Sequence, residues 1–150
     1  MEVMKVLSVS SLSADHTTLE TILSRSTEFL SSDSQWVLRQ ANSVSDAIEI
    51  LQRGRMPIVI SDVDIAGSSW KELLEPLVRL PRRPHLIVSS RLADDYLWAE
   101  ALNLGAYDVL AKPFCAEEVV RTVASAWRRW RRPEAVTRRP ASPPRVAAAC

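Results

Sequence analysis

The sequence lacks the features by which several protein classes are identified from sequence alone. No apolar stretch in its 150 residues approaches the roughly 20 residues that a membrane-spanning helix needs. The first residues, MEVMKVLSVSS, lack the basic start and the long apolar middle of a secretion signal. The two cysteines, Cys115 and Cys150, have no metal-ligand spacing, and we predict ordinary reduced thiols. We therefore expect a cytoplasmic chain that contacts no membrane and holds no cysteine-bound metal.

The net charge of only +1 hides an uneven distribution along the chain. From Arg128 onward there are seven arginines and one acid, Glu134, so residues 128–150 carry +6 and residues 1–127 carry −5. The segment 128–150 is also rich in proline and alanine, a composition that predicts a disordered tail. We expect one folded domain over residues 1–127. Contact with nucleic acid is not expected, apart from weak and non-specific contact by the tail.

Short strand patterns alternate with helical patterns along residues 1–127. Five strands are predicted around KVLSV, WVLRQ, PIVIS, HLIVS and YDVLA, and apolar residues at helical spacing follow each of them. We predict that Ser13 is the N-cap of the first helix, and that Ser43 and Gly54 bound the second. A helix is also predicted over residues 70–79, bent or shortened by Pro76. Such alternation predicts an α/β fold in which helices cover both faces of a parallel sheet.

Polar side chains follow the predicted strands at the points where they end. These are Ser10 and Ser11 after the first strand, Asp62 and Asp64 after the third, Ser89 and Ser90 after the fourth, and Lys112 after the fifth. In a parallel α/β sheet the functional crevice lies outside these carboxyl ends. Asp62 could accept a phosphoryl group, with Lys112 supplying positive charge and Ser89 a hydroxyl. Each residue alone could also be structural, as half of an ion pair or as a helix cap.

Three stretches resemble the receiver domain of bacterial two-component response regulators: ISDVDIAG, IVSSR and LGAYDVLAKPF. The resemblance covers residues 1–127 and implies a flavodoxin-like (βα)5 sheet with strand order 2-1-3-4-5. It implies that Asp62 takes a phosphoryl group from the phosphohistidine of a sensor kinase or phosphotransfer protein. By the same resemblance, Ser89, Ser90 and Lys112 bind the phosphoryl oxygens, and the Lys112–Pro113 peptide bond is cis.

The magnesium site departs from the family's pattern. Ser10 and Ser11 stand where the family has two acidic residues that hold Mg²⁺, and neutral hydroxyls are poor ligands for this ion. Asp62 and Asp64 are the remaining carboxylates. We therefore predict a Mg²⁺ site that is weak or absent.

The signalling aromatic of the family is also displaced. Val109 stands where the family has an aromatic residue in the fifth strand that reports phosphorylation, and Tyr107 lies two places earlier. We do not expect the usual hydroxyl–aromatic switch to operate.

The sequence thus predicts a stand-alone receiver domain, not an enzyme, that signals through protein partners, with a homodimer left open. No output domain is recognisable after residue 127. A first alternative is a pseudo-receiver, the same fold used as a phosphorylation-independent interaction module. A second is a haloacid-dehalogenase-like phosphatase, which also uses an Asp-x-Asp motif. In that family the motif follows the first strand, and Glu117 and Glu118 are poor candidates for its further acidic pair.

Overall fold

The computed structural model describes residues 2–26 and 34–132 of the chain. Its centre is a five-stranded parallel sheet in the order β2-β1-β3-β6-β7. The strands are β1 (Glu2–Val9), β2 (Ser34–Ala41), β3 (Ile58–Asp62), β6 (His85–Ser90) and β7 (Asp108–Ala111). Two-residue strands β4 (Asp64–Ile65) and β5 (Ser68–Ser69) form a small antiparallel hairpin after β3. Since β6 and β7 are the fourth and fifth strands of the sheet, the predicted order and fold class are confirmed.

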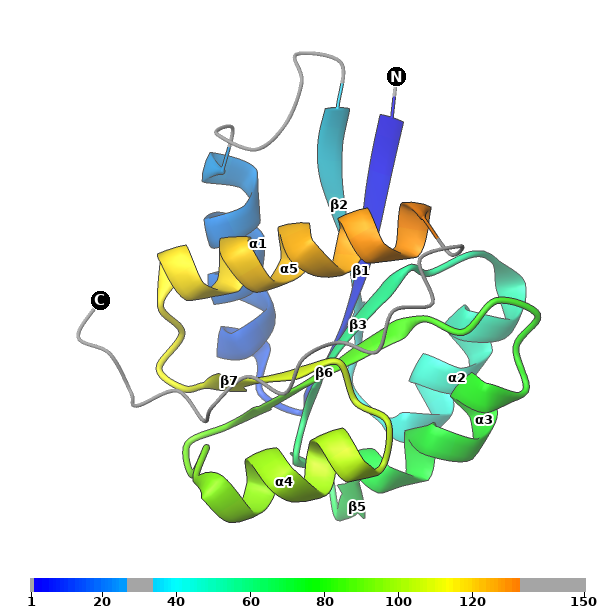
Figure 1. Ribbon diagram of the computed structural model, residues 1–150, viewed down its shortest axis with the longest axis vertical. Helices are drawn as coiled ribbons and strands as arrows, with labels where there is room; N and C mark the ends of the chain where they lie inside the picture. Colours follow the sequence, from blue (N-terminus) through cyan, green and yellow to red (C-terminus); the bar gives the residue numbers. More distant parts are fainter. Residues whose placement is uncertain (1, 27–33, 133–150) are drawn as a thin grey trace.

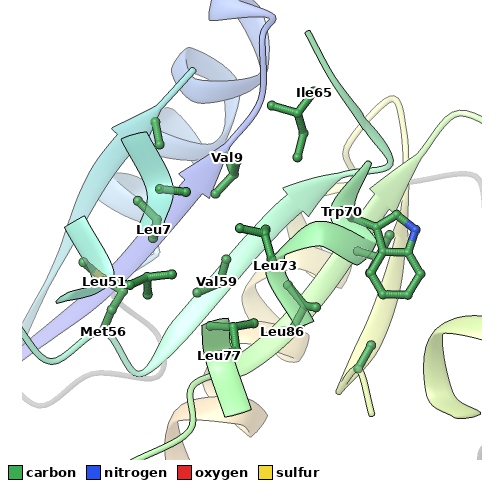
Figure 2. Close-up of a cluster of buried hydrophobic side chains, with 14 of the residues drawn as sticks. Leu7, Val9, Leu51, Met56, Val59, Ile65, Trp70, Leu73, Leu77 and Leu86 are labelled. Atoms are coloured by element: carbon green, nitrogen blue, oxygen red, sulfur yellow. The ribbon is translucent and has the colours of Figure 1, made fainter. Parts of the chain in front are cut away.

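Helices cover both faces of this sheet (Figure 1). One face carries α1 (Ser13–Arg25) and α5 (Ala116–Arg131), and the other carries α2 (Val44–Arg53), the 3-10 helix η1 (Trp70–Leu73), α3 (Leu74–Val78) and α4 (Asp95–Asn103). Neighbouring strand residues alternate between the two faces, so Val6 packs in the α1–α5 layer and Leu7 in the opposite one. Figure 2 shows the hydrophobic cluster on the face covered by α2, η1, α3 and α4, in which Val59 and Leu86 meet Leu77 of α3. A fully buried aliphatic side chain contributes about 1.5–3 kcal/mol, so this packing fixes the strand ends firmly.

Two predicted helices differ in detail from the structure. Ser13 is the first residue of α1 and not its cap, because Leu12 occupies the N-cap position without a side-chain hydrogen bond. The predicted helix at 70–79 is divided into η1 and α3, and Pro76 lies in the first turn of α3, where a missing N–H is tolerated. The second helix is as predicted, since Ser43 Oγ accepts a hydrogen bond from the backbone N–H of Asp46.

The last helix, α5, continues to Arg131, past the boundary predicted at residue 127. Trp127 and Trp130 lie one turn apart with their rings stacked, 5.7 Å between centroids. The Arg82 guanidinium lies 3.5 Å from the centre of the Trp130 ring. These contacts attach the end of α5 to the loop before β6. Residues 133–150, which include most of the predicted tail, lie outside the described residues.

Cys115, immediately before α5, is disulfide-bonded, so the prediction of a reduced thiol there is wrong. The prediction rested on sequence spacing, which says nothing about which cysteines are close in space. Cys150 lies outside the described residues. Within the described part of the chain, no helix has both the length and the apolar character needed to cross a membrane.

Candidate functional site

Asp62 is the last residue of β3, at the carboxyl edge of the sheet. Its side chain is 10% exposed. The backbone N–H of Val63 donates to Asp62 Oδ1 at 2.9 Å, and Asp62 Oδ2 lies 3.1 Å from Lys112 Nζ. The carboxylate is therefore largely buried, oriented by its own chain and paired with an ammonium group.

Lys112 follows β7 and reaches two carboxylates at once. Its Nζ lies 3.1 Å from Asp62 Oδ2 and 2.9 Å from Asp15 Oδ2. The Lys112 side chain is only 6% exposed. Its backbone N–H donates to the carbonyl of Ser90, and the following bond to Pro113 is cis. The ammonium group is thus a bridge between two acids that come from different parts of the chain.

Ser89 and Ser90 end β6 beside this pair. Ser89 is directly opposite Asp62 in the parallel register, and its carbonyl accepts a hydrogen bond from the N–H of Val63. Among the described residues, no hydrogen bond of the Ser89 hydroxyl is found. The Ser90 hydroxyl accepts a hydrogen bond from the N–H of Leu92 at 3.0 Å, and its own proton can still be donated. The strand end therefore presents two hydroxyl groups near the Asp62–Lys112 pair.

Of the three remaining predicted site residues, one lies at the site and two are exposed to solvent. Ser10 is buried, and its hydroxyl donates to Asp15 Oδ2 at 2.7 Å while accepting from the N–H of Leu12. Ser11 and Asp64 are both exposed. Asp64 lies in the β4–β5 hairpin, and the contacts within the described chain join its carboxylate neither to Asp62 nor to Lys112. The structure therefore brings Ser10 to the site, while Ser11 and Asp64 face solvent.

Asp15 is the residue of this cluster that sequence reasoning missed. It is the third residue of α1, yet its carboxylate meets Ser10 Oγ and Lys112 Nζ at the edge of the sheet. A signal was available, because an acid in the first helical turn after the first strand lies near the carboxyl edge of a parallel sheet. The position is displaced from the strand end, where acidic residues were sought.

His16, the next residue, holds the segment between β1 and α1 in place. It is 1% exposed, and its Nδ1 lies 2.8 Å from Ser8 Oγ. Its Nε2 lies 3.0 Å from both the Ser10 carbonyl and Asn42 Oδ1. Because both of these are acceptors, Nε2 carries the proton in this arrangement, with the Asn42 amide oriented as described. The imidazole thereby joins the end of β1 to the segment that follows β2.

Tyr107 and Val109 lie on opposite sides of the sheet. The Tyr107 hydroxyl is 2.5 Å from Ser125 Oγ of α5, and its ring contacts that of His85. Val109 is buried in the cluster shown in Figure 2. Tyr107 is thus held against α5, and Val109 is buried in the opposite layer.

The family model of the response regulator receiver domain matches residues 14–124. The chain belongs to this family. Receiver domains are signalling modules of two-component systems, and the match favours this assignment over the phosphatase alternative. The sensory transduction protein LytT of Bacillus cereus is 30% identical over 87 residues, which are 58% of this chain and 35% of that protein. This chain thus matches about a third of the length of that relative.

Solved structures share the fold at lower identity. The signal receiver domain of an HD domain-containing protein from Pseudomonas fluorescens gives a TM-score of 0.74 at 20% identity, covering 91% of this chain and 96% of that one. A response regulator from Burkholderia pseudomallei, solved with a phosphorylated aspartic acid, a calcium ion and citrate, gives 0.67 at 21% identity. That match covers 88% of this chain and 75% of the other. Both similarities concern the fold.

Receiver domains typically bind Mg²⁺ at the phosphorylation site. The residues here fit a divalent cation poorly. Within the described residues, no group of three or more His, Cys, Asp or Glu side chains is placed to hold a metal ion. The two carboxylates that do approach each other, from Asp15 and Asp62, are already bridged by the Lys112 ammonium. Positive charge at this point of the site therefore comes from a side chain.

Proposed function

We propose that this receiver domain is a phosphorelay switch in which Asp62 accepts a phosphoryl group from a sensor histidine kinase or a phosphotransfer protein. The observation that carries the proposal is the meeting of three strand ends at one buried point. Asp62 and Ser89 lie at the ends of β3 and β6, Lys112 directly follows β7, and the ammonium lies 3.1 Å from the Asp62 carboxylate. A charged pair held this deeply at a ligand-binding edge is an arrangement typical of functional sites.

In the proposed reaction a phosphoryl group passes from a histidine nitrogen of the donor to a carboxylate oxygen of Asp62. A carboxylate oxygen of Asp62 attacks the phosphorus of the donor's phosphohistidine, and the P–N bond breaks as the new O–P bond forms. The electron pair of the broken bond returns to the imidazole nitrogen, and Asp62 becomes an acyl phosphate. The Lys112 ammonium and the hydroxyl groups of Ser89 and Ser90 donate hydrogen bonds to the phosphoryl oxygens.

Output passes to a protein partner in this proposal. The acyl phosphate adds negative charge at the sheet edge, and the Lys112 ammonium follows that charge. Because Lys112 is also bound to Asp15 of α1, its movement changes the contacts of that helix. The signalling unit is the receiver domain predicted over residues 1–127, whose last helix α5 continues into the basic segment 128–150 as far as Arg131, and a second copy of the chain is an alternative partner.

Intact-mass measurement after incubation with a small acyl phosphate donor tests the proposal. We expect the unmodified chain to gain the mass of one phosphoryl group and Asp62→Asn to gain none. Asp64→Asn is the matched control, because this exposed acid lies two residues away and outside the buried pair. Loss of the modification in Asp64→Asn but not in Asp62→Asn would refute the assignment.

A pseudo-receiver is the second candidate, and the bridged carboxylates favour it. Lys112 already pairs with Asp62, and by the family resemblance Ser10 stands where an acid is expected, so an incoming phosphoryl group must compete with an existing ion pair. The two functions differ in partner binding. A pseudo-receiver binds its partner equally well as wild type and as Asp62→Asn, with or without phosphodonor.

A further inference from the structure

We propose that the Lys112 ammonium, positioned by Asp15, is the resident cation of this site and takes the place of a divalent metal ion. The inference deepens the proposed function of the Asp62 site and rests on it for its biological meaning. Its physical content, however, concerns metal affinity in the resting protein. It can therefore be tested without any phosphorylation.

The geometry places one cation between two acids. Lys112 Nζ lies 2.9 Å from Asp15 Oδ2 and 3.1 Å from Asp62 Oδ2, both within the range of charge-assisted contacts. The exposed fractions of the three side chains are 6% for Lys112, 13% for Asp15 and 10% for Asp62. Solvent therefore screens these contacts little, and each carboxylate uses an oxygen on the ammonium that it would otherwise offer to a metal.

Asp15 is fixed independently of Lys112. It lies in the first turn of the 13-residue helix α1, where the helix dipole favours a negative charge. The Ser10 hydroxyl donates to the same oxygen that binds Lys112, at 2.7 Å. His16, the neighbour of Asp15, binds the Ser10 carbonyl and so holds both ends of this short segment together. Asp15 is thus a positioning residue that keeps the ammonium over the sheet edge.

The charge balance explains why a metal ion is disfavoured. With Lys112 in place the three groups sum to −1, and a divalent cation would have to displace the ammonium or bind beside it. Without the ammonium the same two carboxylates sum to −2 and become oxygen ligands of the kind that Mg²⁺ accepts. Removing the lysine should therefore create metal affinity, which is the opposite of what loss of a merely structural residue would do.

Calorimetric titration with MgCl₂ tests this on the full chain. We expect wild type to bind Mg²⁺ only weakly, and Lys112→Met to bind it about tenfold more tightly or better, because a competing positive charge has gone. The double variant Lys112→Met, Asp15→Asn should lose that gain. Lys71→Met is the matched control, since this lysine forms a salt bridge of the same length, 2.9 Å, but with a different acid, Glu100, and is 48% exposed.

A second measurement keeps the proposal falsifiable if Lys112→Met fails to fold. In wild type, NMR should show a Lys112 side-chain NH₃⁺ signal protected from exchange with water, and Asp15→Asn should weaken this protection, because only the Asp62 contact remains. Tight Mg²⁺ binding by wild type, an unchanged affinity in folded Lys112→Met, or a rapidly exchanging Lys112 ammonium in wild type would each overturn the proposal. Failure of Asp62 to be phosphorylated leaves all these readouts unaffected, so the two proposals fail separately.

Discussion

Because Lys112 bridges Asp15 and Asp62, we expect loss of the lysine to destabilise the protein much more than loss of either acid. An ion pair of only two residues would not show this difference. Replacing Lys112 by methionine keeps most of the side-chain length but leaves two carboxylates facing each other. At an effective dielectric constant of about 20, each of the two contacts near 3 Å is worth about 5 kcal/mol, and the repulsion between the carboxylates about 3 kcal/mol. Desolvation offsets part of this, so we expect Lys112→Met to lower the free energy of unfolding by about 3–5 kcal/mol.

Removing either acid should cost far less. In Asp62→Asn or Asp15→Asn the ammonium keeps one carboxylate at about 3 Å, as the distances of 2.9 and 3.1 Å indicate. The lost attraction is largely compensated by relief of the repulsion and of the desolvation of one charge. We expect a change of about 1 kcal/mol or less in the free energy of unfolding for either variant.

Urea unfolding followed by tryptophan fluorescence measures all of these variants. Lys71→Met serves as the exposed control and should change the unfolding free energy by about 1 kcal/mol or less, because its partner Glu100 is 46% exposed. A Lys112→Met variant as stable as the control would show that Lys112 does not bridge two buried carboxylates. An Asp62→Asn variant as strongly destabilised as Lys112→Met would show the same.

Three further predictions concern the metal site, Tyr107 and the tail. The double substitution Ser10→Asp, Ser11→Asp should create Mg²⁺ binding that calorimetry can measure. We expect position 10 to provide most of the added affinity, because Ser10 is buried at the site whereas Ser11 is exposed. Absence of Mg²⁺ binding in this variant would contradict the prediction. Tyr107→Phe should lower stability by about 0.5–1.5 kcal/mol through loss of the Ser125 contact, without changing phosphorylation of the chain. Any DNA binding should be weak, fall steeply with salt and disappear when the chain ends at Trp127, because residues 128–150 carry +6; undiminished binding would show that this segment is not the binding element.

The sheet and its order were predictable because they depend on features that repeat along the chain. The strand patterns at IVISD and HLIVSS are continuous apolar runs, typical of strands buried on both faces. The small β4–β5 hairpin and the 3-10 helix η1 were not predicted. Each strand of the hairpin has two residues and η1 has four, too few for a repeating apolar pattern to be recognised, so local backbone geometry decides them, with Ala66 and Gly67 at positive φ in the hairpin turn.

The site was predictable only in part, for a related reason. Asp62, Ser89 and Lys112 follow strands, and parallel topology brings strand ends together whatever the loops do. Asp15 follows a loop, and its position depends on how Ser10 turns the chain into α1. Treated as a partly exposed pair, Lys112 and Asp62 would have been expected to contribute about 1 kcal/mol or less. The depth of burial, which alters that expectation, becomes visible only in three dimensions.

The most direct test of the account is an NMR titration of the full chain with beryllium fluoride, a phosphoryl analogue, with and without Mg²⁺. We predict saturable shifts of the backbone signals of Asp62, Ser89 and Lys112, accompanied by shifts at Asp15, and no shifts in Asp62→Asn. The shifts should appear without added Mg²⁺, since the Lys112 ammonium supplies the positive charge of the site. An unchanged spectrum of the wild-type chain, or the same shifts in Asp62→Asn, would contradict the assignment of Asp62 as the phosphoacceptor.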